Sequence, residues 1–338
     1  MTDHSNSLID TARALMAAGK GLLAMDESLG TCNRRFAPLG IAQTEENRRR
    51  YRELLVTTPQ LAQHISGAIL FEETLYQHAK DGTPFVDILK AAGIVVGIKV
   101  DAGAQPLAGF PGERITEGLD GLRERLQQYA GQGARFAKWR AVLSIDTGLP
   151  SRTAIEANAQ GLARYAALCQ EAGVVPIVEP EVLMDGDHDL ARCQAVTREV
   201  LDVVFAQLHR HGVLLEGMLL KPNMVLPGEG GPQVSVQAVA QATVETLRRA
   251  VPAAVGGIAF LSGGQSSALA TEHLNAMHQG APLPWPLTFS YGRALQDDAL
   301  RLWAGDDANV QRAQQALLLR ARCNGAAAQG QYRPAMEG

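Results

Sequence analysis

The stretch LLEGMLLKPN, residues 214–223, is an apolar run that ends in a lysine followed by a proline. Pro222 biases Lys221 toward an extended backbone, so the run predicts a short buried strand with Lys221 at its end. A glycine-marked loop follows, and residues 235–250 then have the pattern of an amphipathic helix. The stretch therefore predicts a unit of strand, loop and helix, from which parallel sheets are built.

The same unit recurs along the chain. Seven further apolar segments predict strands: 21–27 (GLLAMDE), 65–73 (ISGAILFEE), 95–101 (VVGIKVD), 136–143 (FAKWRAVL), 174–181 (VVPIVEPE), 257–264 (GIAFLSGG) and 286–292 (PLTFSYG). Helices are predicted between them at 154–171, 189–210 and 265–278, and again after residue 293. Strands that are apolar throughout are typical of a parallel sheet covered on both faces. Eight of them favour an α/β fold with a single (β/α)8 TIM barrel and extra terminal helices. Strand number alone leaves an open doubly wound sheet as the alternative.

The composition fits one large domain. The 338 residues include 31 Lys+Arg and 35 Asp+Glu, which gives a net charge of -4, and no basic block occurs. This balance argues against nucleic acid and anionic membranes as partners. The four cysteines lie far apart and the N-terminus has no apolar signal region, so we expect reduced thiols and a cytoplasmic protein. We expect a single domain over 1–338, with 1–8 and 329–338 as flexible tails.

Polar and charged residues stand at the predicted strand ends, where barrels build their active sites. They are Asp26, Lys99, Lys138 with Arg140, Glu179 with Glu181, Lys221, Ser262 with Gly263, and Arg293. The chain has only six lysines beside 25 arginines, and three of the six stand at these ends. Charges within apolar strands are costly to bury unless they are paired or used in chemistry. The pattern therefore predicts a functional site.

Lys221 is the candidate nucleophile of this site. In an apolar setting, with Lys138 as a like-charged neighbour, its amine is expected to have a lowered pKa. A neutral amine can attack a carbonyl and form a Schiff base, which draws electrons from an adjacent C–C bond. The alternative is a lysine that only pairs with a buried carboxylate.

The neighbouring charges supply candidate acids and bases. Glu179 and Glu181 are two residues apart and so share one strand face, where they can divide into an acid and a base or neutralise a lysine. Lys138 and Arg140 have the same spacing, which predicts that both point into the barrel. Asp26 can accept hydrogen bonds from a substrate hydroxyl or cap a helix.

The run SGGQSSALATEHL, residues 262–274, predicts a glycine turn that leads into a helix N-terminus, a typical anion site. One predicted phosphate site consists of Ser262, Gly263, Gly264, Gly292 and Arg293. A second consists of Ser28, Thr31, Arg35 and Lys99, with Arg140 as a further substrate-binding residue. Two phosphate sites flanking a Schiff-base lysine indicate a bisphosphorylated sugar as the substrate.

Other signals are weaker. LSGGQ at 261–265 also occurs in ABC-type ATPases, but the chain has no P-loop motif to accompany it. DGDHD at 185–189 has the spacing of a calcium loop without the glutamate that closes one. The histidines show no metal-binding pair apart from His209 and His211, near a predicted helix end. We therefore expect no metal and no cofactor.

The segments MDES, GIKVD, FAKWR, IVEPE, DGDHDL, EGMLLKPNM, FLSGGQS and LTFSYGRAL resemble the class I fructose-bisphosphate aldolases, and the likeness runs from about residue 8 to 332. The resemblance implies a (β/α)8 barrel, metal-free Schiff-base chemistry and a homotetramer. It also implies the reversible cleavage of fructose 1,6-bisphosphate to dihydroxyacetone phosphate and glyceraldehyde 3-phosphate, in glycolysis and gluconeogenesis.

The resemblance also implies individual roles. Lys221 would form the Schiff base, and Glu179 would be the main proton-transfer group, assisted by Lys138 and Glu181. Asp26 would take part in cleavage and orient the C4 hydroxyl. The C1 phosphate would be held by Ser262, Gly263 and Arg293, and the C6 phosphate by Ser28, Thr31, Arg35 and Lys99.

Two departures from the family pattern affect these implications. Many members carry a longer tail ending in a tyrosine that enters the site, whereas Tyr332 in GQYRPAMEG matches an internal position. The proton step that depends on that tail is therefore not carried over. Ala102 stands where a lysine is often found, near the second phosphate end. The alternatives are another Schiff-base aldolase that prefers fructose 1-phosphate or a related monophosphate, and a non-catalytic sugar-phosphate-binding scaffold.

Overall fold

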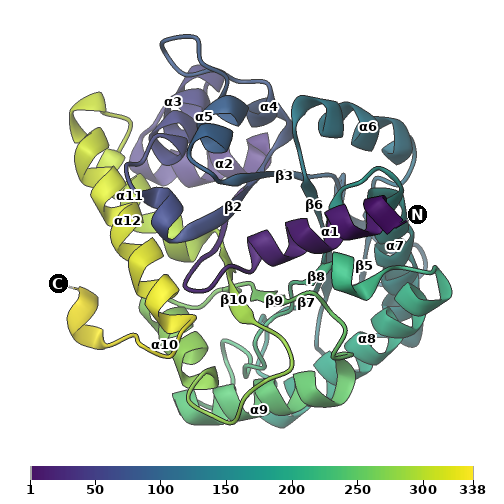
Figure 1. Cartoon of the computed structure of the whole chain (residues 1–338). Helices are drawn as coiled ribbons and strands as arrows, with labels where there is room; N and C mark the ends of the chain where they lie inside the picture. The colour runs from purple at the N-terminus through teal and green to yellow at the C-terminus, as the bar shows by residue number, and fades with distance from the viewer. Residues whose placement is uncertain (1, 338) are drawn as a thin grey trace.

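The computed structural model describes residues 2–337, and its main sheet closes into a parallel barrel (Figure 1). The barrel strands are β1 Gly21–Met25, β2 Ile65–Leu70, β3 Val95–Lys99, β6 Phe136–Leu143, β7 Val175–Val182, β8 Leu219–Leu220, β9 Ile258–Phe260 and β10 Leu287–Tyr291. Their order around the barrel is β1, β10, β9, β8, β7, β6, β3 and β2. Each predicted strand supplies one of them, so the closed barrel is confirmed and the open sheet is excluded.

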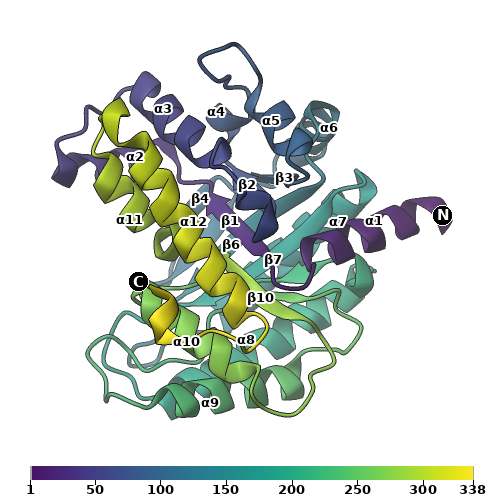
Figure 2. The same ribbon diagram turned by 60° about the vertical axis from the view of Figure 1, so that its left-hand side comes forward.

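Helices surround the barrel (Figure 2). They are α1 Thr2–Leu15, α2 Leu29–Phe36, α3 Glu45–Val56, α4 Glu72–Leu75, α5 Phe85–Ala91, α6 Leu122–Gln132, α7 Arg152–Glu171, α8 Leu190–Arg210, α9 Val236–Ala250, α10 Ser267–Met277, α11 Arg293–Trp303 and α12 Val310–Ala327. Short 3₁₀ turns lie at Ala37–Leu39, Leu61–Gln63, Leu215–Gly217, Asp307–Asn309 and Pro334–Glu337. The predicted helices at 154–171, 189–210, 235–250 and 265–278 correspond to α7, α8, α9 and α10. No helix within residues 2–337 combines the length and apolar character needed to span a membrane.

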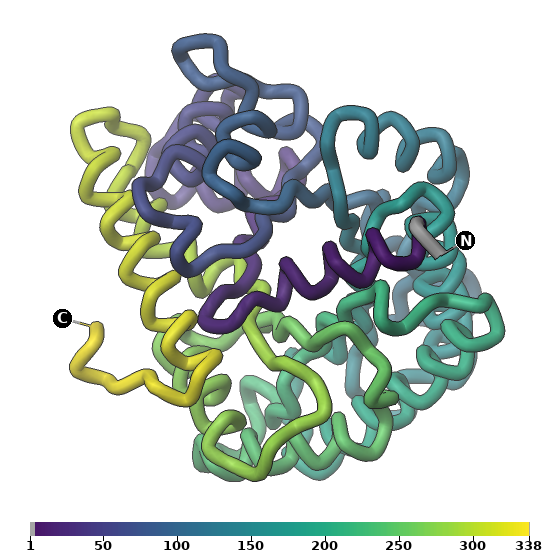
Figure 3. The backbone as a smooth tube through the Cα atoms, in the orientation of Figure 1, coloured from purple at the N-terminus to yellow at the C-terminus, as the bar shows by residue number. Residues whose placement is uncertain are grey.

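Helix α1 lies across one end of the barrel, as the backbone trace shows in purple (Figure 3). Its Leu8 and Leu15 belong to an apolar cluster with residues from the barrel interior, among them Phe136, Val175 and Leu219. These three stand at the beginnings of β6, β7 and β8. Helix α1 therefore closes the end where the strands begin, and the open end is the one where they finish.

The two predicted flexible tails are folded in the structure. At the first, α1 begins at Thr2, Leu8 is 3% exposed, and the imidazole of His4 lies 2.6 Å from the carbonyl oxygen of Gln170. At the second, the buried Tyr332 donates from its hydroxyl to Glu337 at 2.9 Å. The sequence reasoning missed these contacts because they are made to distant parts of the chain. Residues 1 and 338 of the predicted tails lie outside the described residues.

Strand β8 is shorter than the predicted strand at 214–223, because residues Leu215–Gly217 form a 3₁₀ turn. The side chain of Gln170 accepts from Leu214 N–H and donates to the carbonyl oxygens of Leu214 and Gly217. These bonds satisfy backbone groups that would otherwise need a neighbouring strand. The correction leaves Lys221 at the end of the strand, where it was predicted.

A hairpin of β4 Gly103–Pro106 and β5 Arg114–Glu117 was not predicted from the sequence. It lies between β3 and α6 in the chain, and the hydroxyl of Thr116 donates to the carbonyl oxygen of Arg140 at 2.8 Å. The hairpin is therefore fixed to β6 next to the open end of the barrel.

Candidate active site

A cavity of about 1100 Å³ opens where the barrel strands finish. Every residue predicted for catalysis or binding, except Gly264, lines it: Asp26, Ser28, Thr31, Arg35, Lys99, Lys138, Arg140, Glu179, Glu181, Lys221, Ser262, Gly263, Gly292 and Arg293. The prediction of strand-end positions is wrong in part, because Lys138, Arg140, Glu179 and Glu181 lie within the long strands β6 and β7. Thr31 and Arg35 lie on α2. The others end or follow a strand, and the parallel topology brings these distant parts of the sequence to one opening.

Four buried charges meet at the bottom of this cavity. Lys221 Nζ lies 3.1 Å from Glu179 Oε1, and Lys138 Nζ lies 3.3 Å from Glu179 Oε2. Lys138 Nζ also lies 2.7 Å from Asp26 Oδ2. The side chains of all four are at most 10% exposed. The two lysines are thus neighbours through one shared carboxylate.

The alternation of side chains along β6 explains how Lys138 reaches the cluster. Lys138 points into the barrel, whereas Trp139 is buried on the outside against Tyr165 of α7, with the ring centroids 5.5 Å apart. In a strand, neighbouring side chains point to opposite faces, so the large tryptophan anchors the strand from behind. The predicted inward direction of Lys138 and outward direction of Trp139 are confirmed.

The electrostatics of the cluster keep both acids ionised. Burial alone would raise the pKa of Glu179, but attraction to Lys138 and then to Lys221 outweighs burial and lowers it. The pKa of Asp26 is likewise lowered by Lys138 and Lys221 against the effect of burial. Burial would lower the pKa of Lys138, but Asp26 and Glu179 raise it well above its ordinary value. At neutral pH, Glu179 is therefore a carboxylate within hydrogen-bond reach of the Lys221 amine, which is the geometry of a nucleophile and its base.

Two features of this cluster bear on the sequence predictions. The closest described partner of Lys221 is the Glu179 carboxylate, so pairing with a buried acid and a role as nucleophile occur together. Within residues 2–337, Glu179 Oε2 has the ion-pair contact with Lys138 but no hydrogen bond of good geometry, so it can still accept one.

Glu181 and Arg140 form a second pair nearer the rim. Arg140 Nε donates to Glu181 Oε2, and the Arg140 side chain is 43% exposed. The carboxylate of Glu181 is therefore engaged by a cation at the mouth, whereas Glu179 faces the lysines below. The spacing of two residues placed both glutamates on one face, but it could not tell which one would contact Lys221.

One wall of the cavity is made by the turn after β9 and by the start of α11. Ser262 and Gly263 line the cavity from the turn, and Gly292 and Arg293 line it from the next strand end. Within residues 2–337, the N–H groups of Gly263 and Gly264 have no hydrogen-bond partner. Free N–H groups beside an arginine are suited to an anion such as phosphate.

Gly264, also predicted to bind phosphate, does not line the cavity. Its φ is +77°, and a Cβ at this position would lie 2.9 Å from Met184 Sδ and 3.0 Å from Glu229 Oε1. The backbone turns sharply between Gly263 and Gly264, so only the first glycine faces the opening. Gly264 instead packs against the loops that follow β7 and β8.

The residues of the second predicted anion site do not share one wall: Ser28 and Thr31 follow β1, which pairs with β10, whereas Lys99 ends β3, on the far side of β2. Because β9 and β10 lie across the barrel from β6 and β3, the Ser262 wall faces Lys99 and Arg140. Ser28 caps α2, its hydroxyl oxygen accepting from the N–H of Thr31 at 3.3 Å. Lys99 Nζ lies 2.6 Å from Asp101 Oδ1, so this cation already has an acid partner.

The side chain of Arg35 was expected to bind phosphate but is engaged by acids. It pairs with Glu27 and, at 2.9 Å, with Asp297 of α11. The exposed Arg34 instead donates to Thr31 Oγ1 at 2.9 Å and lines the same cavity. Sequence reasoning missed Arg34, although its position three residues after Thr31 on a helix could have indicated it.

Other lining residues were not predicted from the sequence. Tyr129 donates to Glu72 Oε1 at 2.9 Å, and Arg125 donates to the carbonyl oxygen of Val100 at 2.9 Å. Glu72 lies on α4, and Arg125 and Tyr129 lie on α6. How close these helices come to the opening depends on tertiary packing, which the local sequence does not show. Asp101, two residues after Lys99, could have been found by its place at the end of β3.

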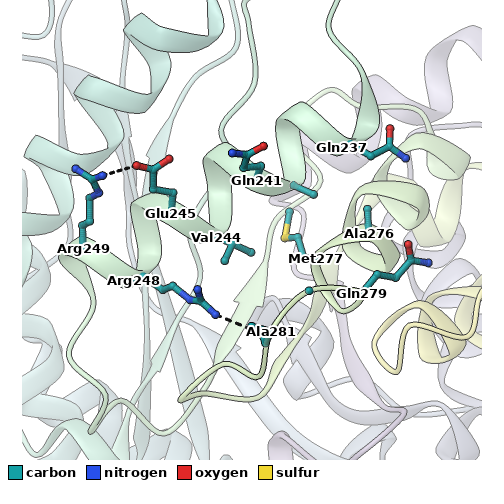
Figure 4. A pocket seen from close by; sticks show the side chains of 12 residues that line it. Gln237, Gln241, Val244, Glu245, Arg248, Arg249, Ala276, Met277, Gln279 and Ala281 are labelled. Atoms are coloured by element: carbon teal, nitrogen blue, oxygen red, sulfur yellow. Dashed lines mark hydrogen bonds and ion pairs between the residues drawn. The ribbon is translucent and has the colours of Figure 1, made fainter.

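A second hollow, of about 630 Å³, lies between α9 and α10, away from the strand ends (Figure 4). Arg249 pairs with Glu245 along α9, and Arg248 donates to the carbonyl oxygen of Ala281 at 3.3 Å. Its lining includes no lysine and no second acid to form a proton-transfer pair. Among the described residues, no three His, Cys, Asp or Glu side chains gather into a group that could hold a metal ion. The barrel cavity is therefore the candidate active site.

Comparison with known proteins points to one family. The family model described as "Fructose-bisphosphate aldolase class-I" matches residues 7–338. A "Probable fructose-bisphosphate aldolase class 1" of Xanthomonas campestris pv. campestris is 57% identical over 328 residues, covering 96% of this chain and 98% of the relative. "Fructose-bisphosphate aldolase 6, cytosolic" of Arabidopsis thaliana is 54% identical, covering 97% and 92% respectively.

A solved structure has the same architecture. The fructose-bisphosphate aldolase from Plasmodium falciparum, in complex with TRAP and a small-molecule inhibitor, superposes with a TM-score of 0.97 at 50% identity. The alignment covers 98% of this chain and 97% of that one. The similarity thus extends over the whole barrel and its helices.

Proposed function

The chain belongs to the class I fructose-bisphosphate aldolase family, and on that premise we propose that Lys221 forms the Schiff base of its reaction. The enzyme is a lyase that cleaves fructose 1,6-bisphosphate reversibly to dihydroxyacetone phosphate and glyceraldehyde 3-phosphate. The observation that carries the assignment is the contact of 3.1 Å between Lys221 Nζ and the Glu179 carboxylate inside the cavity.

Schiff-base formation follows from this contact. Glu179 removes a proton from the Lys221 ammonium, and the free amine attacks the C2 carbonyl carbon of the sugar. The resulting carbinolamine hydroxyl takes the proton back from Glu179 and leaves as water, which produces a protonated imine. The proton lost at the start is thus the one that departs with the water. Lys138, held between Asp26 and Glu179, keeps both acids ionised at the start of the cycle.

Cleavage of the C3–C4 bond uses the imine as the electron acceptor. The C4 hydroxyl loses its proton to Asp26, the electron pair of the C3–C4 bond moves toward the imine nitrogen, and glyceraldehyde 3-phosphate departs. The proton that Asp26 received returns to C3 of the enamine that remains, and water then hydrolyses the imine to release dihydroxyacetone phosphate. Glu181 and Arg140 form the polar rim beside these steps.

The two predicted anion sites support a bisphosphate as the preferred substrate. Ser262, Gly263 and Arg293 would hold the phosphate on C1, and Ser28, Thr31 and Lys99, from the start of α2 and the end of β3, would hold the phosphate on C6. A monophosphate such as fructose 1-phosphate would leave the second site empty. Ala102, which lines the cavity, adds no charge there, so the preference depends on Arg34, Lys99 and Arg140.

We propose that catalysis needs no metal and no cofactor, because the family is the Schiff-base type and Lys221 supplies the electron sink itself. Cleavage of fructose 1,6-bisphosphate is expected to continue at an unchanged rate after dialysis against EDTA. A coupled assay of triose phosphate formation measures this, with a zinc-dependent aldolase as the positive control for chelation. A loss of activity that zinc restores would contradict the proposal.

Two further assignments rest on relatives or on the family resemblance. The cytosolic relatives from Arabidopsis thaliana support a cytoplasmic location, where the reaction would serve glycolysis and gluconeogenesis. The resemblance supports a homotetramer. Sedimentation equilibrium should therefore give a mass four times the 36.1 kDa of the chain, and a single-chain mass at micromolar concentration would contradict it.

A further inference from the structure

We propose that His273 is a positioning residue for the C1 phosphate: through Gln265 it holds the turn after β9 in the shape that presents the N–H group of Gly263 to the substrate. The inference rests on the proposed function, because it assigns a support to the phosphate wall of the same site. His273 lies on α10, behind the turn, and does not itself line the cavity.

The turn needs such a support. Its residues Gly263 and Gly264 both have positive φ values, 42° and 77°, which are open to glycine but leave the backbone loosely restrained. Within residues 2–337 their N–H groups make no hydrogen bond, so the ladder of the sheet does not fix them. A flexible turn would lose conformational entropy each time it bound a phosphate, and this loss weakens binding.

The side chain of Gln265 makes hydrogen bonds that support this turn. Its Nε2 donates to the carbonyl oxygen of Ser262 at 2.9 Å, parallel to the bond at 3.1 Å that the Gln265 N–H makes to the same oxygen. Both bonds converge on the Ser262 carbonyl oxygen, so the side chain of Gln265 reinforces the backbone bond that closes the turn. The amide can make this bond only if its Oε1 points away, and that oxygen lies 2.6 Å from His273 Nδ1.

These contacts determine the state of the imidazole. Because Gln265 Oε1 can only accept, His273 Nδ1 must carry the proton and donate it. Burial lowers the pKa of His273 to about 4, so at neutral pH the ring is uncharged and keeps one fixed N–H. His273 is 2% exposed, and its ring therefore has little freedom to release the amide.

Helix α10, which bears His273, is anchored from two sides. The buried Arg320 of α12 donates to the carbonyl oxygen of Ser267 at 3.0 Å and to Thr271 Oγ1 at 2.6 Å. Tyr291, the last residue of β10, donates to the carbonyl oxygen of Ala270 at 3.1 Å. We call the hydrogen-bonded pair of Gln265 and His273 the brace. It connects the turn after β9 to α10, and α10 is fixed to α12 and β10.

The test compares His273→Leu with His273→Asn, whose amide can still donate to Gln265. For His273→Leu we expect the inhibition constant of inorganic phosphate and the KM values for fructose 1,6-bisphosphate and fructose 1-phosphate to rise together by about tenfold. All three ligands place a phosphate in the C1 site. We expect His273→Asn to recover most of the loss, and kcat to change less than KM.

A matched control is Thr246→Val, which removes a buried hydrogen bond from the neighbouring helix α9. It should lower the melting temperature without changing the phosphate inhibition constant. The proposed role of His273 is wrong if His273→Leu also loses only thermal stability. It is wrong too if His273→Asn binds phosphate no more tightly than His273→Leu. If wild-type Lys221 cannot be trapped by borohydride with dihydroxyacetone phosphate, the proposed function itself fails, which is a separate result.

Discussion

Borohydride reduction in the presence of dihydroxyacetone phosphate is expected to leave a covalent adduct on Lys221, and Lys221→Met is expected to lower kcat/KM by about 10⁴-fold or more. Methionine keeps the length and apolar stem of the side chain but has no amine, so no imine can form. Arginine would fail for the same reason, since a guanidinium stays charged and cannot condense with a carbonyl.

Peptide mapping by mass spectrometry identifies the trapped lysine. The informative comparison is Lys99→Met, which removes a cation from the far wall of the same cavity. That variant should still be trapped on Lys221, while its KM for fructose 1,6-bisphosphate rises. An adduct found on Lys138, or Schiff-base activity that survives in Lys221→Met, would overturn the assignment. If the wild-type chain binds sugar phosphates but shows no cleavage that Lys221→Met could remove, a scaffold is favoured instead.

Glu179→Gln should lower kcat by about 10²- to 10⁴-fold, the usual contribution of a positioned acid or base. The amide keeps the size of the side chain but cannot take the proton from Lys221 or return it to the carbinolamine. Pre-steady-state trapping with borohydride should show that the adduct on Lys221 forms more slowly in this variant but still forms. Glu181→Gln is the control, because its carboxylate contacts Arg140 at the rim, and its effect should be clearly smaller. A larger effect at Glu181 would exchange the two roles.

The same variant should be less stable at neutral pH, because Lys138 and Lys221 lose the carboxylate that they share. Breaking a buried ion pair in this way costs roughly 3 kcal/mol. The pKa of Glu179 is lowered in the folded protein, so its stabilising contribution is complete above the ordinary value of 4.5 and is lost as the pH falls through the lowered value. Thermal melts should therefore show wild type and Glu179→Gln converging under acidic conditions.

The barrel could be predicted because each strand unit contains its own signal in a short stretch. A strand such as FAKWRAVL shows its burial and its inward lysine through local alternation alone. The shortened β8 could not be predicted, because the groups that end the strand are satisfied by Gln170, which is 44 residues earlier than Leu214 in the chain. Tertiary contacts of this kind override local pattern and leave no trace near the affected segment.

The same distinction applies to the active site. The meeting of Lys221, Glu179 and Asp26 in one cavity was predictable because a parallel barrel brings inward-facing residues of different strands together, whatever their separation in sequence. Which of these charged residues pair with one another was not predictable. Whether Glu179 or Glu181 contacts Lys221 depends on how deep each lies in the barrel, and the engagement of Arg35 by Asp297 depends on the packing of α2 against α11. Cavity-lining residues from α4 and α6 were missed for the same reason.

Among residues 2–337, helix α1 covers the barrel where the strands begin, and the cavity that holds Lys221 opens at the other end. We therefore expect the sugar to enter, and both products to leave, through that opening. Glyceraldehyde 3-phosphate can depart as soon as the C3–C4 bond breaks, whereas the other half is still tethered to Lys221. In the proposed mechanism the covalent bond to Lys221 therefore sets the order of product release: glyceraldehyde 3-phosphate leaves first, and the two products do not leave at the same time.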